Sequence, residues 1–309
     1  MKALYHYSFA SHEEVLFRCQ EDAGYFLTQM AIRASVHGVE LLADAEMSDH
    51  CHGICEAHRL SPFVGSLRES HTKYMNKKYG RSGRRGDFGF FSRKLLSPTQ
   101  VQTGISYTLR NSVHHGVSGT PYEYRYSSAN EMFARQRGIA VPAGDAIPPE
   151  FLKQLPRYST LPDVLRIGDD GFVLRNSFLE IARAESYYVT PRNFLYQMNR
   201  ISDERWENDQ RRDDPMHPPI RLGDMEPAFD ATAVAQMLAS EKGWKYDPSR
   251  LTDFDVCALI DKQMLGRFRK GSVYLLSDKQ KGAIFRELYN DARLPAKQLK
   301  RCLVMGGTE

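Results

Sequence analysis

Alternation of apolar and polar residues at the start of the chain predicts a β-strand over residues 3–10. The next segment has the pattern of a helix. Ser11 and Glu14 match an N-terminal capping box, and apolar residues then recur every three or four positions. The pair His37-Gly38 has the form of a helix C-terminus. We therefore expect a long helix that begins beside Ser11 and ends at His37.

The next eighty residues continue the same alternation of patterns. They predict strands at 39–47, 50–59 and 88–95 and helices at 61–79 and 97–116. Within the first of these strands, one face is expected to carry Leu41, Ala43, Ala45 and Met47. The order β-α-β-β-α-β with an added helix predicts a ferredoxin-like α+β fold, in which helices cover an antiparallel sheet.

Prolines set the middle of the chain apart. Five of them fall between Val141 and Pro162, which predicts a linker over residues 141–162. We expect one domain at 1–140 and a mostly helical second domain at 163–305. The second domain should begin with a short hairpin, "RIGDDGFVLR", and be interrupted by the acidic, proline-rich stretch "DERWENDQRRDDPMHPP".

Two short helices are predicted near the C-terminus, opening at Ser277 and Pro295. Residues 277–304 are compatible with a helix-turn-helix, whose second helix carries Lys297, Lys300 and Arg301. The alternative is plain packing of two amphipathic helices.

Composition narrows the class of protein. The chain has 41% hydrophobic and 26% charged residues, without an apolar run long enough to span a membrane. The N-terminus lacks the apolar core of a signal peptide, so we expect a cytoplasmic protein. The five cysteines include no CxxC pair, which argues against a disulfide framework.

Positive charge is concentrated between Arg68 and Lys94, where nine Lys or Arg residues face only two acids. Aromatic residues are interleaved with them, which suits a phosphate backbone with stacked bases, although a solvated helix followed by a basic loop is the alternative. The candidate nucleic-acid-binding residues are Lys73, Lys77, Lys78, Arg81, Arg84, Arg85, Arg93 and Lys94.

His50 and His52 are one residue apart on a predicted strand, so both point to the same face, together with Glu56. Two imidazoles on one face can bind one divalent ion, whereas on an exposed strand they would simply be solvated. Cys51 and Cys55 occupy the alternate, core-like positions. That placement favours an inner strand and therefore the metal interpretation.

Tyr107 and Asn111 lie four residues apart on the helix predicted at 97–116, one turn apart on a common face. A tyrosine hydroxyl is a poor nucleophile until a neighbouring group activates it. The alternative is a core tyrosine of an amphipathic helix. For the remaining histidines we expect structural roles: His114 and His115 at a helix C-terminus, His6 packed or exposed, and His217 in a loop.

These segments resemble the single-tyrosine transposases of the His-hydrophobic-His (HUH, IS200-like) family, especially its REP-associated branch. The similar stretches are "YHYSFAS", "ELLADAEMSDHCHGICEA", "YTLRNSVHHG" and "YEYRYSSAN", in family order over roughly residues 4–130. Two prolines common in the family are replaced by Ser48 and Ser112. The long region from residue 150 onward exceeds the minimal catalytic domain.

The resemblance implies an HUH nuclease domain that cleaves and transfers single-stranded DNA. His50 and His52 would hold Mg²⁺ or Mn²⁺ with Asn111 as the third ligand, and Tyr107 would form a 5′-phosphotyrosine link. Zinc is equally compatible with the imidazoles on ligand preference alone. The implied partner is single-stranded or hairpin DNA and not a membrane, and a homodimer is compatible with this interpretation.

Two other functions stay open. One is a domesticated protein that binds DNA hairpins without cutting them. The other is a metal-dependent nuclease that uses an activated water and does not need Tyr107.

Overall fold

The computed structural model describes the chain of 309 residues except for residues 12–13, 85–88, 148–162, 201–202, 226–245 and 307–309. A four-stranded antiparallel sheet lies at its centre, with the order β2-β3-β1-β4. The strands are β1 (Ala3–Ala10), β2 (Glu40–Glu46), β3 (His50–Ala57) and β4 (Phe91–Leu95). This confirms the predicted α+β fold with the strand order of a ferredoxin-like sheet.

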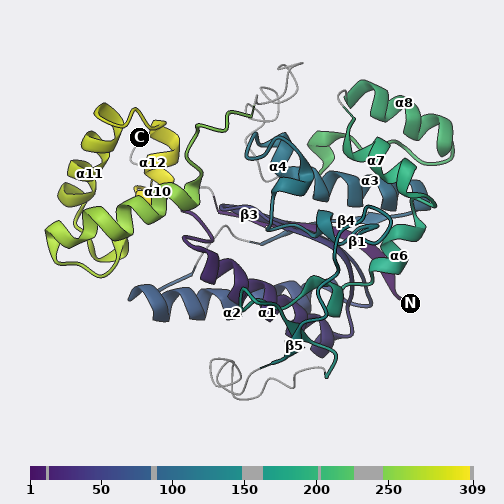
Figure 1. Ribbon diagram of the computed structural model, residues 1–309, viewed down its shortest axis with the longest axis horizontal. Coiled ribbons are helices and arrows are strands. Elements are labelled where there is room, and N and C mark those ends of the chain that lie inside the picture. Colours follow the sequence, from purple (N-terminus) through teal and green to yellow (C-terminus); the bar gives the residue numbers. More distant parts are fainter. Residues whose placement is uncertain (12–13, 85–88, 148–162, 201–202, 226–245, 307–309) are drawn as a thin grey trace.

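Helices cover both faces of the sheet (Figure 1). One face packs against α1 (Gln20–His37) and α2 (Leu60–Tyr79), through an apolar core that includes Tyr7, Phe63 and Cys55. The other face packs against α3 (Pro98–Leu109), which is followed by the single turn α4 (Asn111–His114). Gly53 of β3 has no room for a side chain, because an added Cβ would lie 2.4 Å from the Tyr7 ring.

A bulge in β2 changes one predicted face. The pairing with β3 shifts between Leu41 and Ala43. Leu41 therefore packs into the core under α1 and α2, whereas Ala43 packs on the α3 side. The prediction that Leu41 shares a face with Ala43 is wrong, because an extra residue in one strand reverses the alternation.

The first helix begins later than the sequence predicts, at Gln20 instead of beside Ser11. Asp22, not Glu14, caps its N-terminus, since its carboxylate accepts the backbone N–H of Arg18 at 2.9 Å. Glu14 instead accepts the Tyr274 hydroxyl at 3.0 Å, so a tertiary contact replaces the local cap. The helix end at His37 is confirmed, with Gly38 in the left-handed conformation.

The helix predicted at 97–116 begins as expected at Pro98, with Ser97 as its N-cap, but it is interrupted at Arg110. Tyr107 lies in the last turn of α3 and Asn111 is the first residue of α4, so they are not on one continuous helix as predicted. Directly after the interruption, the Asn111 side chain contacts His50 of β3.

The region after the predicted linker contributes α6 (Ile181–Ser186), α7 (Pro191–Met198) and α8 (Asp203–Asp213). Within the predicted hairpin, β6 (Arg166–Ile167) is joined to the returning segment by the isolated bridge Ile167–Val173, whereas its strand partner is β5 (Asp145–Ala146), which precedes the hairpin. Residues 148–162 of the predicted linker lie outside the described residues, and the division into domains stays a prediction.

The stretch beginning at Asp203 was expected to interrupt the helices, yet its first eleven residues form α8. Trp206, Asp209 and Gln210 are buried at helical spacing. Gln210 exchanges two hydrogen bonds with the backbone of Ile220, at 2.9 and 2.8 Å. Tertiary contacts thus stabilise a helix that has almost no apolar stripe.

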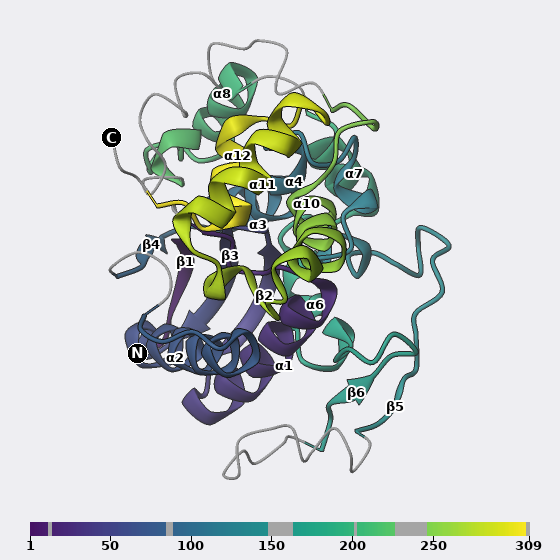
Figure 2. The ribbon, with the colours of Figure 1, turned by 90° about the vertical axis from the view of Figure 1, so that its left-hand side faces the viewer.

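The terminal helices are α10 (Asp253–Leu259), α11 (Asp278–Asn290) and α12 (Ala296–Leu303), and they share an apolar core of their own. Figure 2 shows them in front of α3 and α4, above the level of α1 and α2. The helix starts predicted after Ser277 and Pro295 are confirmed. Among the described residues, no helix is both long and apolar enough to cross a membrane.

Short helical turns complete the described structure. They lie at Pro121–Glu123, Ser128–Asn130, Arg175–Ser177, Leu222–Asp224, Ile260–Met264, Leu265–Phe268 and Val273–Leu275.

Candidate active site

His50 and His52 lie at the start of β3 and point to the same face of the sheet, toward α3. Their ring centroids are 5.2 Å apart, and both side chains are buried. On the opposite face of the strand, Cys51 and Cys55 are packed in the apolar core, as the alternation predicts. The solvated-strand alternative therefore does not describe these histidines.

His6 joins them from β1. Its Nε2 lies 3.0 Å from Nδ1 of His52, and the two rings are stacked with centroids 5.2 Å apart. The alternation of β1 places His6 on this face, opposite Tyr5 and Tyr7. Strand periodicity thus predicts the face of His6, and of the packed and exposed roles expected for it, the structure shows the packed one.

Asn111 and Asp49 contact the two nitrogens of the His50 ring. Asn111 Oδ1 lies 2.7 Å from Nε2, and Asp49 Oδ1 lies 2.7 Å from Nδ1. Both of these oxygens are acceptors, so each ring nitrogen that carries a proton can donate to its partner; in the tautomer with the proton on Nδ1, Nε2 is the nitrogen that can bind a cation. Asp49 lies in the bend between β2 and β3, and no sequence motif marked it as part of a site.

Asp49 keeps its negative charge because of a contact from the C-terminal helices. Burial by itself would raise the pKa of this carboxyl, but the Arg301 guanidinium and the hydrogen bond from His50 outweigh burial and lower it well below its usual range. Arg301 Nη1 lies 2.7 Å from Asp49 Oδ2. No sequence pattern connects positions so far apart.

Tyr107 packs against the cluster of histidines, and its side chain is fully buried. Its ring centroid is 5.5 Å from that of His52 and 6.1 Å from that of His6. His114 stacks on it at 5.5 Å, and Trp206 of α8 lies parallel to it at 6.5 Å. The nucleophile candidate is thus surrounded by imidazoles and covered by the region beyond residue 163.

His114 and His115 were expected only to complement a helix end, and the structure places both beside the site. The His115 ring centroid is 4.7 Å from that of His50. Glu56, which shares the strand face of the histidines, instead binds Arg183 at the far end of β3, with oxygen–nitrogen distances of 3.0 and 3.1 Å. His217 lies in a loop, as predicted.

The predicted nucleic-acid-binding residues are not gathered around these histidines. Lys73, Lys77 and Lys78 belong to α2, on the opposite face of the sheet. Lys78 is engaged by Asp22 at 2.7 Å, and Arg81 lies 3.4 Å from Glu14.

The rest of the basic stretch is divided in the same way. Arg93 pairs with His6 across β1 and β4 and so lies on the histidine face, whereas Lys94 pairs with Tyr5 and lies on the other face. Arg84 is exposed, and Arg85 lies outside the described residues. DNA binding by the stretch as a whole stays a prediction.

In the part of the chain that the structure describes, no three side chains among histidine, cysteine, aspartate and glutamate are arranged to hold a metal ion. The candidate donor set is different, because it combines two imidazoles with the amide oxygen of Asn111. Such nitrogen and oxygen donors suit Mg²⁺ less well than Mn²⁺ or Zn²⁺, on ligand preference.

No family model and no curated protein matches the chain. Among solved structures, it is similar to the REP-associated tyrosine transposase bound to a REP hairpin, with 14% identity, 46% of this chain and 86% of that chain covered, and a TM-score of 0.38. It is also similar to a candidate transposase from Deinococcus radiodurans R1, with 22% identity, 33% and 86% coverage, and a TM-score of 0.27. The structural similarity thus includes transposases, as the motifs predicted, over less than half of this chain.

Proposed function

We propose that the protein is a metal-dependent enzyme that cleaves and rejoins single-stranded DNA, with Tyr107 as the nucleophile. The observation that carries the proposal is the convergence of His50, His52, Asn111 and Tyr107, which come from separate elements, in one buried cluster. Burying several imidazoles and an amide is unfavourable unless their hydrogen bonds or ligands compensate, so a functional role is the economical explanation.

The chemistry assigned to Tyr107 is an in-line displacement at phosphorus. Its phenolic oxygen forms a bond to the phosphorus atom, the bond from phosphorus to the 3′ oxygen breaks, and the 3′ oxygen leaves and takes up a proton. The phenol proton passes to one of the surrounding imidazoles or to water. Attack by another 3′-hydroxyl reverses the reaction, so no nucleotide cofactor is needed.

His50, His52 and Asn111 are the residues that would hold the metal ion. Two atoms that bind one ion at about 2.1 Å lie roughly 3 Å apart, and His50 Nε2 and Asn111 Oδ1 are separated by 2.7 Å. Both are electron-pair donors when Asp49 holds the proton on Nδ1, so a cation satisfies them together. A bound divalent ion polarises the phosphoryl group and stabilises the leaving oxygen.

Access to Tyr107 requires a local rearrangement, since its side chain is fully buried. His114 of α4 and Trp206 of α8 lie nearly parallel to the ring, with centroids at 5.5 and 6.5 Å, so admission of a DNA strand would require one of these elements to move. We therefore expect the substrate to be a flexible single strand, for instance one that flanks a hairpin, and not a rigid duplex.

The decisive experiment incubates the protein with single-stranded and hairpin oligonucleotides and Mn²⁺, followed by denaturing electrophoresis. We expect a covalent adduct that resists SDS and carries the 5′ end of the cleaved product. Tyr107→Phe should remove the adduct, a loss of about a thousandfold or more, because the variant lacks the nucleophilic oxygen.

Tyr122→Phe is the matched control, since this half-buried tyrosine packs against the same core without contacting the histidines. It should form as much adduct as the parent. Equal adduct formation by Tyr107→Phe would refute the nucleophile assignment. Cleavage without any adduct would favour a metal-activated water, and binding of hairpins without cleavage in several metals would favour a pure binding protein.

A further inference from the structure

The terminal helix α12 reaches the candidate metal centre through a short series of buried polar contacts. Arg301 Nη1 lies 2.7 Å from one oxygen of Asp49, and the other oxygen of Asp49 lies 2.7 Å from His50 Nδ1. Each oxygen of this carboxylate therefore has one partner, and the two partners lie 251 positions apart in the sequence.

A second acid fixes the guanidinium in place. Arg301 Nη2 lies 2.6 Å from Oδ2 of Asp253 on α10. The same carboxylate oxygen accepts the hydroxyl of Ser48 at 2.6 Å. Ser48, Asp49, Arg301 and Asp253 thus form a closed ring of contacts, which ties the terminal helices to the turn that precedes His50.

This arrangement determines how His50 can act as a ligand. A carboxylate that accepts the Nδ1–H of a histidine fixes the ring orientation, keeps Nε2 as the donor nitrogen, and increases its basicity. Arg301 in turn fixes the carboxylate. Since Arg301 is engaged in this way, the basic residues that α12 exposes are Lys297 and Lys300.

We propose that Arg301 is a positioning residue, which acts through Asp49 to orient His50 for metal binding. The C-terminal helices would then be a structural part of the active centre and not only an appended DNA-binding unit. The inference rests on the proposed role of His50 as a metal ligand.

The test measures the binding of Mn²⁺ alone, without DNA, by calorimetry or electron paramagnetic resonance. Arg301→Gln should weaken Mn²⁺ binding about 10- to 100-fold, the range expected when a partner of a ligand is lost. Asp49→Asn should have an effect of the same size, and the double variant should be little worse than either single one, since both changes break the same series of contacts. Arg301→Lys should recover part of the affinity.

Arg267→Gln is the matched control, because Arg267 forms an exposed ion pair with Glu287 on the same group of helices. It should leave Mn²⁺ binding unchanged. A metal-free readout is the ¹⁵N spectrum of labelled histidine, in which Arg301→Gln and Asp49→Asn should each shift His50 from a single tautomer to a mixture.

The outcomes separate the two proposals. If the parent binds Mn²⁺ and both Arg301→Gln and Asp49→Asn bind it equally well, the positioning role of Arg301 is overturned, but the metal centre is not. A parent that binds no divalent ion would overturn the metal centre and this inference with it, while Tyr107-dependent adduct formation would still test the nucleophile separately.

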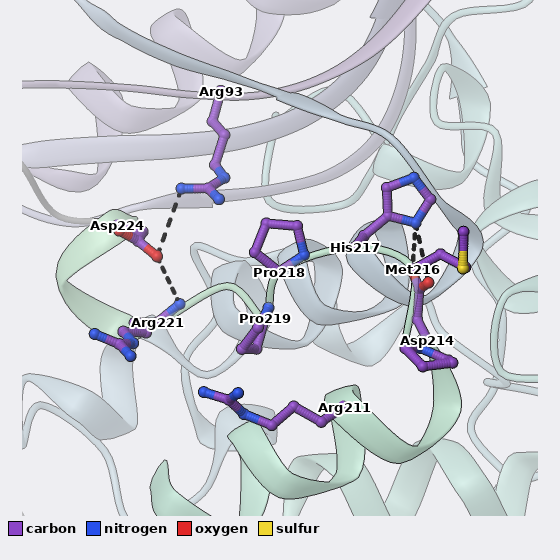
Figure 3. A pocket seen from close by; sticks show the side chains of 10 residues that line it. Arg93, Arg211, Asp214, Met216, His217, Pro218, Pro219, Arg221 and Asp224 are labelled. Carbon is purple, nitrogen blue, oxygen red and sulfur yellow. Dashed lines mark hydrogen bonds and ion pairs between the residues drawn. The ribbon is translucent and has the colours of Figure 1, made fainter.

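A different observation concerns a cavity of about 750 Å³ between β4, the end of α8 and the loop that follows it. Figure 3 shows Arg93 on one side of this cavity, Arg211 on the other and Arg221 at its edge, with Pro218 and Pro219 between them. The volume lies within the range of small-molecule sites.

Each arginine of this cavity has an acidic neighbour at the long end of the ion-pair range. Arg93 lies 3.5 Å from Asp224, and Arg211 and Arg221 lie 3.7 and 3.4 Å from the same Glu207. The second acid of the cavity, Asp214, accepts hydrogen bonds from Ser97 and from His217, which lower the pKa of its carboxyl. Three arginines from three segments therefore line one hollow.

The geometry points to a subsite for a phosphate-bearing nucleotide of single-stranded DNA, with the proline surface against the sugar or base. Ser97, which contacts Asp214, opens the helix that carries Tyr107, so the cavity lies about 15 Å from Tyr107 along the axis of α3. Arg93 was among the residues predicted from sequence to bind nucleic acid, which agrees with this assignment. The subsite rests on DNA being the substrate.

Fluorescence anisotropy with an oligothymidylate, in the absence of divalent ions, tests this subsite independently of catalysis. Arg211→Gln and Arg221→Gln should each weaken binding severalfold and reduce the slope of log affinity against log salt by about one. The matched control is Arg212→Gln, an exposed neighbour on α8 that pairs with Asp213 and does not line the cavity. Unchanged affinity and slope in both variants would refute the subsite, whether or not adduct forms.

Discussion

On the face of the sheet covered by α1 and α2, strand β3 contributes Cys51 and Cys55 to an apolar core; on the face covered by α3, the same strand contributes His50 and His52. Both faces are buried to a similar degree. They differ at the start of β3, where the first face has apolar packing and the second has a connected set of polar contacts beside the apolar core that includes Ile54.

The difference would let one strand serve both stability and the proposed chemistry. Successive side chains of a strand point to opposite faces, so residues on one face can be substituted without replacing those on the other. The polar face is tolerated because its histidines contact Asp49, Asn111 and one another. Substitutions on the two faces should therefore separate function from stability.

The largest expected effect comes from His52→Ala on the polar face. Removing one of the proposed ligands should lower Mn²⁺ affinity more than a hundredfold and reduce adduct formation below detection, while the free energy of unfolding falls by only about 1–2 kcal/mol. Calorimetric Mn²⁺ titration and denaturant unfolding measure the two quantities. Cys51→Ala is the matched control, since its side chain points to the opposite face, and it should bind Mn²⁺ like the parent. If His52→Ala bound Mn²⁺ as tightly as the parent, the polar face of β3 would not be the metal-binding face.

On the apolar face, Phe63→Ala should have the converse effect. Phe63 is fully buried against Tyr7, with ring centroids 5.8 Å apart, and its loss leaves a cavity that costs about 3–5 kcal/mol of unfolding free energy. Chemical denaturation measures this change. At a temperature where the variant is folded, Mn²⁺ affinity should equal that of the parent, and a selective loss of Mn²⁺ binding would show that the two faces are coupled.

A smaller effect is expected at the edge of the apolar face, where Asp22 caps α1. Burial would raise the pKa of this carboxyl, but Lys78, the backbone of Arg18 and Tyr79 outweigh burial and lower it. Because the folded-state pKa lies below the unfolded one, the contribution is present above about pH 4 and is lost as the pH falls through the folded-state pKa.

Asp22→Asn should therefore lower the free energy of unfolding by about 1–3 kcal/mol at pH 7. The difference from the parent should shrink as the pH falls below about 4, which urea unfolding at a series of pH values measures. Glu21→Gln is the matched control, because Glu21 also contacts Lys78 but its side chain is largely exposed. A difference between Asp22→Asn and parent that is constant with pH would contradict the charge interpretation.

Much of the fold follows from local pattern. Alternation located β1 and β3 and the faces of their side chains, and turn and cap residues located the ends of α1 and α2 and the starts of α3, α11 and α12. Local pattern was misleading where a distant contact intervened: Glu14 binds Tyr274 instead of capping a helix, and Gln210 binds Ile220 within a stretch that is too polar to predict a helix.

For the candidate site, the sequence by itself determined the pair His50 and His52 and the face they share, because strand periodicity is a local property of the backbone. It also proposed Tyr107 and Asn111, although as neighbours on one helix. Only the tertiary structure decided that a break at Arg110 turns Asn111 onto His50, that His6 stacks on His52, and that Arg301 reaches Asp49. Those contacts join residues far apart in the chain, and only the packing of complete elements brings such residues together.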